Sequence, residues 1–308
     1  INLDFFKLKS PSLIGVDISS SSVKMVELSM VGKGNQSYRI ERYVIESMPV
    51  DAMLDGAIVD LEAVSECLQR GWKRMGTRQR NVALALPATD VITKKIFVPA
   101  GQREDDLAYQ VETEASQYIP FSLDEIDLDF QVIRPVPENP EEVEVLIAAS
   151  RKEKVEDRVA VALSAGLKAA VIDVEPYAAQ AAFELTLSQL PEGGKDKVVA
   201  LVDIGATIMK INVLHNGESV YTRPFCETLA IEVMRAIQFF YTSTQYTEVH
   251  YIFIAGGCAV IPGLNEIIAS RTQVSTLIVN PFSNMELSSR IIPRQLNLDA
   301  PALLIACG

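Results

Sequence analysis

Residues 13–24 read LIGVDISSSSVK, and residues 199–210 read VALVDIGATIMK. Each stretch is an apolar run that ends in an aspartate, followed by small residues and a second apolar run. A lysine stands seven positions after the aspartate in both copies. Apolar runs separated by a small-residue turn predict a β-hairpin. Because the same spacing occurs in both halves of the chain, we expect two matching hairpins.

The chemistry of these stretches suits an anion site. Small residues let backbone N–H groups approach a phosphate closely, and hydroxyl groups add further donors. A carboxylate next to a phosphate is unfavourable unless a cation lies between them, and Mg²⁺ prefers oxygen ligands. We therefore expect Asp17 and Asp203 to hold Mg²⁺ through water, in a clamp for a nucleotide. The alternative for either copy alone is an ordinary hairpin with Ser and Gly at its turn.

The composition limits the class of protein. The chain has 308 residues, of which 48% are hydrophobic, which is enough for two domains with sizeable cores. It carries 28 basic and 40 acidic residues, a net charge of -12. Nucleic-acid binding depends on Lys and Arg that neutralise phosphates, so this balance argues against a nucleic acid as the main partner.

Cysteine and histidine usage indicates the cellular compartment. The four cysteines have no CxxC spacing, and there are only two histidines, so no zinc site is predicted. Isolated thiols in apolar segments fit a reducing compartment. No signal peptide or membrane-spanning stretch is visible, and we expect a cytoplasmic protein that reaches a membrane only through partners.

Turn residues divide the chain into parts. Residues 1–90 and 168–190 are expected to form a first lobe (1A), and residues 91–167 a β-α-β-β-α subdomain (1C) inserted into it. Residues 191–308 form a second lobe (2A) that repeats the opening strands. Helices are predicted over Leu61–Met75 and Pro176–Leu190.

A third motif follows the second hairpin. The apolar segment from Ile252 to Ala255 runs into Gly256 and Gly257 and then towards a helix. Glycines at the end of a strand let a flat ring lie on the backbone, and a helix N-terminus favours a phosphate. Strand-Gly-Gly-helix turns are common in α/β proteins, so this motif supports a nucleotide site only together with the hairpins.

The three motifs together resemble the actin, Hsp70 and sugar-kinase ATPase superfamily, and the insert resembles that of the bacterial division protein FtsA. Several segments are similar to the PilM family of type IV pilus assembly proteins. These are GVDISSSSVKMVEL at 15–28, QYIPF at 117–121, IDVEP at 172–176, QFFYTSTQYT at 238–247, AGGC at 255–258 and DAPALLIACG at 299–308. The resemblance covers essentially the whole chain. It implies an α/β, actin-like two-lobed ATPase fold with an FtsA-type inserted subdomain in the first lobe.

The resemblance also implies a site for ATP or ADP with Mg²⁺ between the lobes. Its first phosphate loop comprises Asp17, Ser19, Ser20, Ser21, Ser22 and Lys24, and its second Asp203, Gly205, Ala206, Thr207 and Lys210. Gly256 and Gly257 match the adenosine turn.

One junction departs from the family. The strand over Glu218–Phe225 meets a helix expected to begin near Cys226, although such connections usually take about two to six residues. PilM-like proteins have a Gly-rich turn and a helical segment there. The resemblance implies that part of a small lid subdomain (2B) is missing between Phe225 and Cys226, either disordered or deleted.

For function, the resemblance implies an ATP-binding adaptor at the inner-membrane platform of the type IV pilus. It would dock the cytoplasmic N-terminal peptide of PilN in a groove between lobe 1A and subdomain 1C. Tyr118, Ile119 and Phe121 are apolar candidates for that contact, and core packing of the insert is their alternative role. The competing function is an ATPase or small-molecule kinase with turnover. Such an enzyme needs a group that orients water, for which Asp173 and Glu175 are the candidates, without a clear catalytic motif.

Overall fold

The computed structural model describes residues 13–31, 37–54, 56–137, 139–187, 190–206, 209–216, 218–225 and 229–308. Two compact units make up the chain: residues up to Ala85 together with Ala160–Gly308, and residues Leu86–Val159. We call the first the two-sheet unit and the second the inserted unit. Among the helices within these described ranges, none is both long and apolar enough to cross a membrane.

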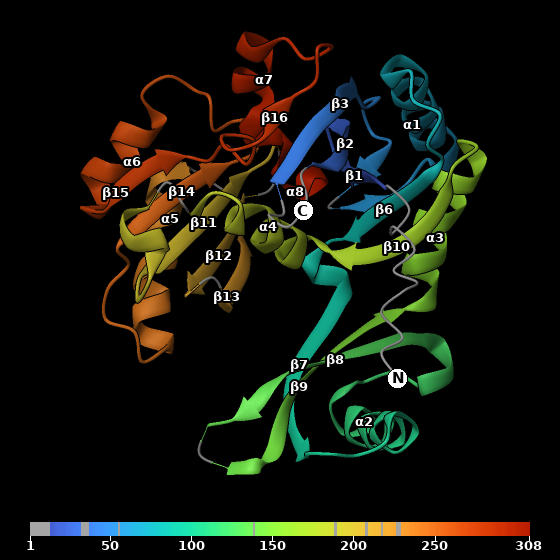
Figure 1. Ribbon diagram of the computed structural model, residues 1–308, viewed down its shortest axis with the longest axis vertical. Helices are drawn as coiled ribbons and strands as arrows, with labels where there is room; N and C mark the ends of the chain where they lie inside the picture. The colour runs from blue at the N-terminus through green and yellow to red at the C-terminus, as the bar shows by residue number, and fades with distance from the viewer. Residues whose placement is uncertain are drawn as a thin grey trace. The chain divides into compact units, whose positions relative to one another are not determined.

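The two-sheet unit contains two sheets with a common strand order (Figure 1). The first sheet runs β10-β6-β1-β2-β3-β16, and the second runs β13-β12-β11-β14-β15. In both, the strand that carries the aspartate pairs antiparallel with the strand that carries the lysine and parallel with a later strand. The strands of the first sheet are β1 (Ile14–Ile18), β2 (Ser22–Val31), β3 (Ser37–Ser47), β6 (Asn81–Leu86), β10 (Lys168–Val174) and β16 (Glu286–Leu287). Those of the second are β11 (Val198–Ile204), β12 (Met209–His215), β13 (Glu218–Phe225), β14 (Tyr251–Ala255) and β15 (Ser275–Ile278).

Register explains the repeated spacing from aspartate to lysine. Asp17 on β1 lies directly opposite Lys24 on β2, and Asp203 on β11 lies directly opposite Lys210 on β12. Residues directly opposite each other in an antiparallel pair have Cβ atoms about 4.5–5.5 Å apart, so opposite charges there attract. The same number of residues in each copy therefore places an aspartate and a lysine directly opposite each other.

The core between the two sheets contains a close contact at a glycine. Helices α4 (Glu175–Glu184) and α8 (Leu304–Cys307) lie between the sheets (Figure 1), and their residues pack in one cluster with Val26, Ile40 and Phe253. Gly15 permits this packing, because a Cβ at that position would lie 2.0 Å from the Ala306 carbonyl oxygen. The sheet and α8 can therefore meet only where β1 has no side chain.

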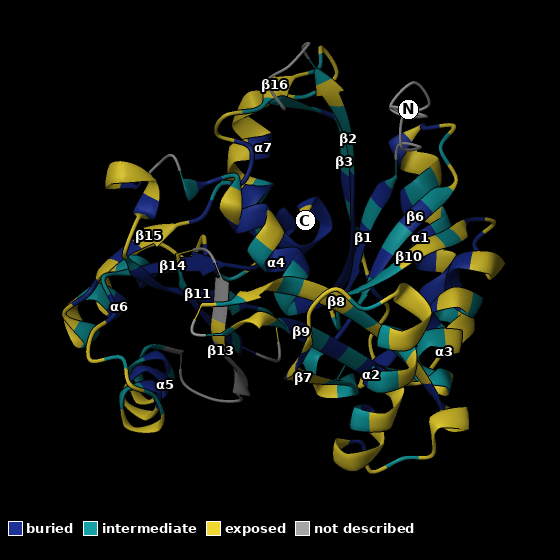
Figure 2. Ribbon diagram, turned by 60° about the horizontal axis from the view of Figure 1, so that its bottom comes forward, coloured by how far each residue is buried: buried dark blue, intermediate teal, exposed yellow. Residues whose placement is uncertain are grey.

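Other helices cover the outer faces. Helix α1 (Leu61–Met75) and the end of α3 (Lys152–Ser164) pack on the first sheet, and α5 (Leu229–Ser243) and α6 (Leu264–Thr272) pack on the second. Figure 2 shows α8 dark blue and the outward faces of α5 and α6 yellow, as expected for helices with one apolar face. The two-sheet unit also contains the short hairpin of β4 (Met53–Leu54) and β5 (Ala57–Ile58), and helix α7 (Pro293–Asp299).

The inserted unit has its own sheet and core. Its strands are β7 (Val91–Pro99), β8 (Ile126–Val136) and β9 (Asn139–Arg151), in the order β7-β9-β8, with helix α2 (Glu104–Tyr118) packed on them through Val111 and Ala115. The unit ends at Val159, inside α3, whereas the sequence predicted a subdomain over 91–167. The difference arises because Val161 and Ala162, later in α3, pack in the core of the first sheet.

Two expected boundaries differ in the structure. Helix α4 was predicted to end at Leu190 but ends at Glu184. The N–H and the hydroxyl of Thr186 both donate to the Phe183 carbonyl, each at 2.7 Å, and these hydrogen bonds tighten the last turn and end the helix. The helix expected to begin near Cys226 begins at Leu229. Cys226 itself lies outside the described residues, so the missing segment stays a prediction.

The Gly15→Ala variant should be destabilised. Its new methyl group would overlap the Ala306 backbone, and forced overpacking costs about 1–3 kcal/mol or more of unfolding free energy. Denaturant unfolding measures this cost. Gly257→Ala is the matched control, because nothing lies within 4 Å of a Cβ there, and it should stay close to the parent. Equal unfolding midpoints for parent and Gly15→Ala would contradict the close approach of β1 and α8.

Candidate functional site

The first hairpin places a buried ion pair beside its turn. Lys24 Nζ donates to Asp17 Oδ2 at 2.7 Å and to Ser19 Oγ at 3.2 Å. The side chains of Lys24 and Asp17 are only 11% and 4% exposed. Because two charges this far from water gain little net stability from each other, the pair points to a role other than stability.

The serine turn is closed by its own hydrogen bonds. The N–H and the hydroxyl of Ser19 both donate to the Ser22 carbonyl, at 3.0 and 2.9 Å. Ser22 is buried and Ser21 is exposed, with Ser20 between these extents. Of the four predicted hydroxyl donors, Ser19 and Ser22 therefore shape the turn, and Ser21 is the most accessible to a ligand.

The second hairpin differs from the first in the partner of its lysine. Lys210 Nζ donates to Glu175 Oε2 at the start of α4, forming an ion pair, while Asp203 stays partly exposed. Within the part of the chain that the structure describes, the Asp203 carboxylate accepts no hydrogen bond. Gly205 and Ala206 follow it, with Ala206 exposed, and Thr207 lies outside the described residues.

The two pairs act on each other electrostatically. Burial opposes the charge on Lys24, but the carboxylates of Asp17 and Asp203 outweigh it, so the pKa of Lys24 is raised. Burial likewise opposes the charge on Lys210, and Glu175 and Asp203 outweigh it to raise its pKa. The structure thus brings both predicted aspartates and both lysines into one electrostatic cluster, which we call the double-hairpin cluster: Asp17, Lys24, Glu175, Asp203 and Lys210.

Burial disfavours the charged form of two carboxylates in this cluster, Asp203 and Glu175. Burial raises the pKa of Asp203, although Lys210 and Lys24 act in the opposite direction. Burial also raises the pKa of Glu175, against the attraction of Lys210. A cation or a further donor would relieve both carboxylates, so the cluster is suited to bind an additional charged group.

The third motif lies directly beside the second hairpin. Gly256 directly follows β14, whose last residue, Ala255, lies opposite Asp203 in the parallel pairing. The Gly256 N–H donates to the Pro301 carbonyl at 2.9 Å. Its φ is 85°, and a Cβ there would lie 2.5 Å from Asp203 Oδ1. Only glycine fits this position. Gly257 has open space around its Cβ position.

The residues present fit a nucleotide with Mg²⁺. Two lysines can attract phosphates, small residues keep the turns open, and Asp203 offers an oxygen without a partner in the described structure. No group of three or more His, Cys, Asp or Glu side chains suited to a metal occurs among the described residues. Asp17 and Asp203 supply two carboxylates, and Mg²⁺ is usually held by one or two carboxylates, water and substrate phosphates.

Glu175, which the sequence offered as a water-orienting group, pairs with Lys210, a contact that the sequence did not predict. The signal is weak, because these residues are 35 positions apart and only the approach of α4 to β12 joins them. Asp173, the other candidate, accepts a hydrogen bond from the Val174 N–H at 2.6 Å, and burial raises its pKa.

The predicted partner residues lie together around the end of α2. Tyr118 is 48% exposed, with Lys94 Nζ 4.8 Å from its ring centre. Phe121 is half-buried under the Arg151 guanidinium, 4.1 Å from its ring centre. Ile119 is only 7% exposed and packs in the core of the inserted unit. Tyr118 and Phe121 are therefore the accessible members.

Solved structures show the same fold. A chain of a PilM-PilN type IV pilus biogenesis complex matches with a TM-score of 0.80 and 24% identity over 96% of each chain. The ethanolamine utilization protein EutJ from Carboxydothermus hydrogenoformans matches with a TM-score of 0.50 and 16% identity, over 97% of this chain and 90% of that one. A Bacteroides thetaiotaomicron protein described as having an actin-like ATPase fold and unknown function gives a TM-score of 0.49 and 12% identity, over 97% and 99%. The predicted actin-like α/β fold is confirmed.

A sequence model of the family described as "Type IV pilus assembly protein PilM" matches residues 15–223 and 222–308. The break between the two matched segments lies beside the junction of Phe225 and Cys226, where the sequence predicted a missing segment. The two segments together span nearly the whole chain, and the chain therefore belongs to the PilM family of type IV pilus assembly proteins.

Proposed function

We propose that this chain is a nucleotide-dependent adaptor of the type IV pilus assembly platform. It binds ATP or ADP with Mg²⁺ at the double-hairpin cluster and binds the N-terminal cytoplasmic peptide of PilN. Membership of the family places the protein in pilus assembly. The observation that carries the nucleotide proposal is the pair of equivalent hairpins, each with Asp opposite Lys, with Gly256 packed against one of them.

The lysines are the proposed phosphate ligands. Each is held by a neighbouring carboxylate, Lys24 by Asp17 and Lys210 by Glu175. A phosphate entering between the hairpins would share these ammonium groups, and Mg²⁺ bound through water to Asp17 and Asp203 would separate carboxylate from phosphate. The open backbone at Gly257 leaves room for the base.

An adaptor is favoured over an enzyme by the state of the candidate water-orienting group. Glu175, one of the two candidates, is paired with Lys210, which lowers its tendency to accept a proton from water. ATP would then serve as a ligand that sets the state of the protein. Multiple-turnover phosphate release at about 1 per second or faster would instead support the ATPase alternative.

PilN is the proposed partner because the structure that matches with a TM-score of 0.80 is a chain of a PilM-PilN complex. The proposed contact is the region around Tyr118 and Phe121 in the inserted unit, where an aromatic side chain is exposed. Aromatic residues are frequent anchors of peptide binding. Binding to PilN would hold the protein at the cytoplasmic side of the inner membrane.

The Asp203→Asn variant tests the nucleotide site. Losing this carboxylate should weaken Mg²⁺-dependent ATP binding at least about tenfold, which corresponds to about 1.4 kcal/mol. Calorimetric titration with ATP, with Mg²⁺ and with EDTA, measures it. Asp127→Asn, an exposed residue of the inserted unit, makes the same charge change and should bind as the parent does. Unchanged affinity in Asp203→Asn would show that the hairpins are not the phosphate site.

The same variant should be more stable than the parent. Since burial raises the Asp203 pKa, the charged carboxylate costs the folded state free energy at pH 7, and asparagine removes that cost. We therefore expect a higher free energy of unfolding for the variant than for the parent at pH 7. The gain is present above the raised pKa and disappears as the pH falls through it, because protonated Asp203 is uncharged. Urea unfolding between about pH 8 and about pH 4 tests this, and a variant less stable than the parent at pH 7 contradicts it.

The Tyr118→Ala variant tests the partner site. Removing an exposed aromatic anchor should weaken binding of the PilN N-terminal peptide by about 2 kcal/mol, roughly thirtyfold. Fluorescence anisotropy of a labelled peptide measures the affinity. Tyr109→Ala on the same helix, at a residue 74% exposed, is the matched control and should leave it unchanged. If neither parent nor variants bind the peptide with or without ATP, the partner proposal is wrong.

A further inference from the structure

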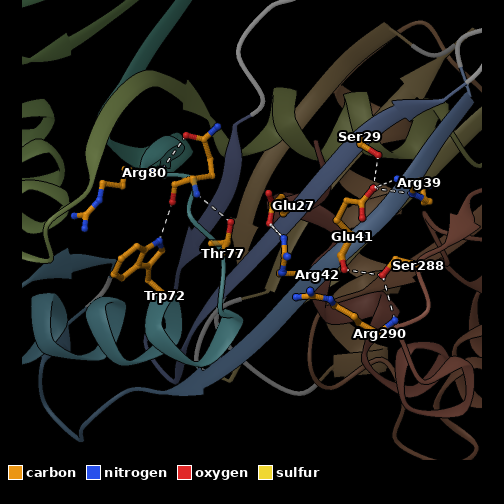
Figure 3. Close-up of polar contacts among 11 residues, drawn as sticks. Glu27, Ser29, Arg39, Glu41, Arg42, Trp72, Thr77, Arg80, Ser288 and Arg290 are labelled. Carbon is orange, nitrogen blue, oxygen red and sulfur yellow. Dashed lines mark hydrogen bonds and ion pairs between the residues drawn. The ribbon is translucent and has the colours of Figure 1, made fainter.

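A polar cavity lies in the two-sheet unit, lined by residues other than those of the double-hairpin cluster. It has a volume of ≈ 670 Å³ and is bounded by β2, β3, the end of α1 and the loop after β16 (Figure 3). Its lining residues are Glu27, Arg42, Gly76, Thr77, Arg78, Gln79 and Arg290. None of these has an apolar side chain, so the cavity is unsuited to an apolar ligand.

The cavity is positively charged in an acidic protein. Three arginines and one glutamate give its lining a formal charge of +2, whereas the chain carries a net charge of -12. Glu27 is paired with Arg42, since its Oε2 accepts a hydrogen bond from Arg42 Nη1 at 2.8 Å. Among the described residues, the guanidinium groups of Arg78 and Arg290 form no ion pair, so two exposed cations remain.

Arg42 has a donor left over. Its Nε is buried and has no hydrogen-bond partner within the described structure, although Nη1 bonds to Glu27. A buried donor without an acceptor is unfavourable, but this nitrogen is covered by protein atoms, so any contact of Arg42 with a ligand in the cavity would come from the end of its guanidinium group. Figure 3 shows the Arg290 side chain reaching towards Arg42, so the positive groups converge.

Hydrogen bonds fix both walls of the cavity. At the end of α1, the Trp72 indole N–H donates to the Gln79 carbonyl at 2.8 Å, and the Gln79 N–H donates to Thr77 Oγ1 at 3.1 Å. On the other side, Ser288 Oγ donates to the Glu41 carbonyl at 2.9 Å, which ties the loop before Arg290 to β3. Groups held in place before a ligand arrives lose less entropy on binding, so these walls favour a specific ligand.

We propose that this cavity binds a small molecule that carries a diphosphate group. Guanidinium groups match phosphate oxygens with paired N–H donors, and the cavity is lined by three arginines and one glutamate. The volume lies within the range of small-molecule sites, about 300–1,000 Å³, and exceeds that of one phosphate, which leaves room for an organic part.

Inorganic pyrophosphate is the probe for this site, in the presence of EDTA. We expect it to bind the full chain with an affinity that falls at least about tenfold in the Arg78→Gln/Arg290→Gln double variant. Both residues are exposed, so folding should be unaffected. Arg103→Gln/Arg294→Gln removes the same charge from exposed positions that do not line the cavity, and it should bind as the parent does. Equal affinity in parent and cavity variant overturns the proposal.

Trp72 provides a local reporter, because it is the chain's single tryptophan and bonds to Gln79 in the cavity wall. Its fluorescence should change with pyrophosphate along the same curve as the heat of binding, and the change should weaken in the cavity variant. If the binding heat disappears instead in Lys24→Gln/Lys210→Gln, pyrophosphate binds at the hairpins and the cavity proposal fails. Succinate binding as tightly as pyrophosphate would overturn the diphosphate assignment.

Discussion

The cross-strand ion pair of Lys24 and Asp17 is the contact on which the arrangement of the site depends. It joins β1 and β2 at the serine turn and orients the lysine into the double-hairpin cluster. Removing two charges from water costs several kcal/mol per ion before their attraction repays it. A protein that needed only a stable hairpin could fill the same space with apolar side chains, so the charges are explained better by a ligand than by folding.

The lysine of the second hairpin has a different partner from the lysine of the first. Lys210 is drawn to Glu175 on α4, which leaves Asp203 partly exposed and its pKa raised by burial. Glu175 begins the helix that packs between the sheets, so the cluster is linked directly to the central core of the unit. A change in the pairing of Lys210 would therefore act on α4, and under the proposed function this is a route by which a bound nucleotide would alter the rest of the two-sheet unit.

Two glycines set the distances within this unit. Gly15 allows α8 to lie against β1, and Gly256 allows the end of β14 to lie against Asp203. In both places a side chain would overlap backbone atoms, which cannot move away cheaply, and at Gly256 it would also overlap the carboxylate of Asp203. Stability and function thus depend on the same close approaches. The charged carboxylate at Asp203, by contrast, is held against stability, as is common for residues of binding sites.

Local features of the fold follow from the order of residues alone. The spacing of Asp17 and Lys24, and of Asp203 and Lys210, predicted hairpins whose register follows from counting residues along two antiparallel strands. The apolar periodicity of Leu61–Met75 gave α1 with its observed bounds. These predictions succeeded because each depends on residues close together in the chain, where the strand or helix period fixes which side chains share a face.

Contacts between groups far apart in the chain depend on how the elements pack. It paired Lys210 with Glu175, buried Ile119 in the core of the inserted unit, and gathered Arg42, Arg78 and Arg290 around one cavity. No period in the sequence encodes these contacts, because they arise where separate elements pack and the energy of each contact depends on everything around it. The sequence therefore determined the two hairpins, while the packing of sheets and helices decided the charges that each of them meets.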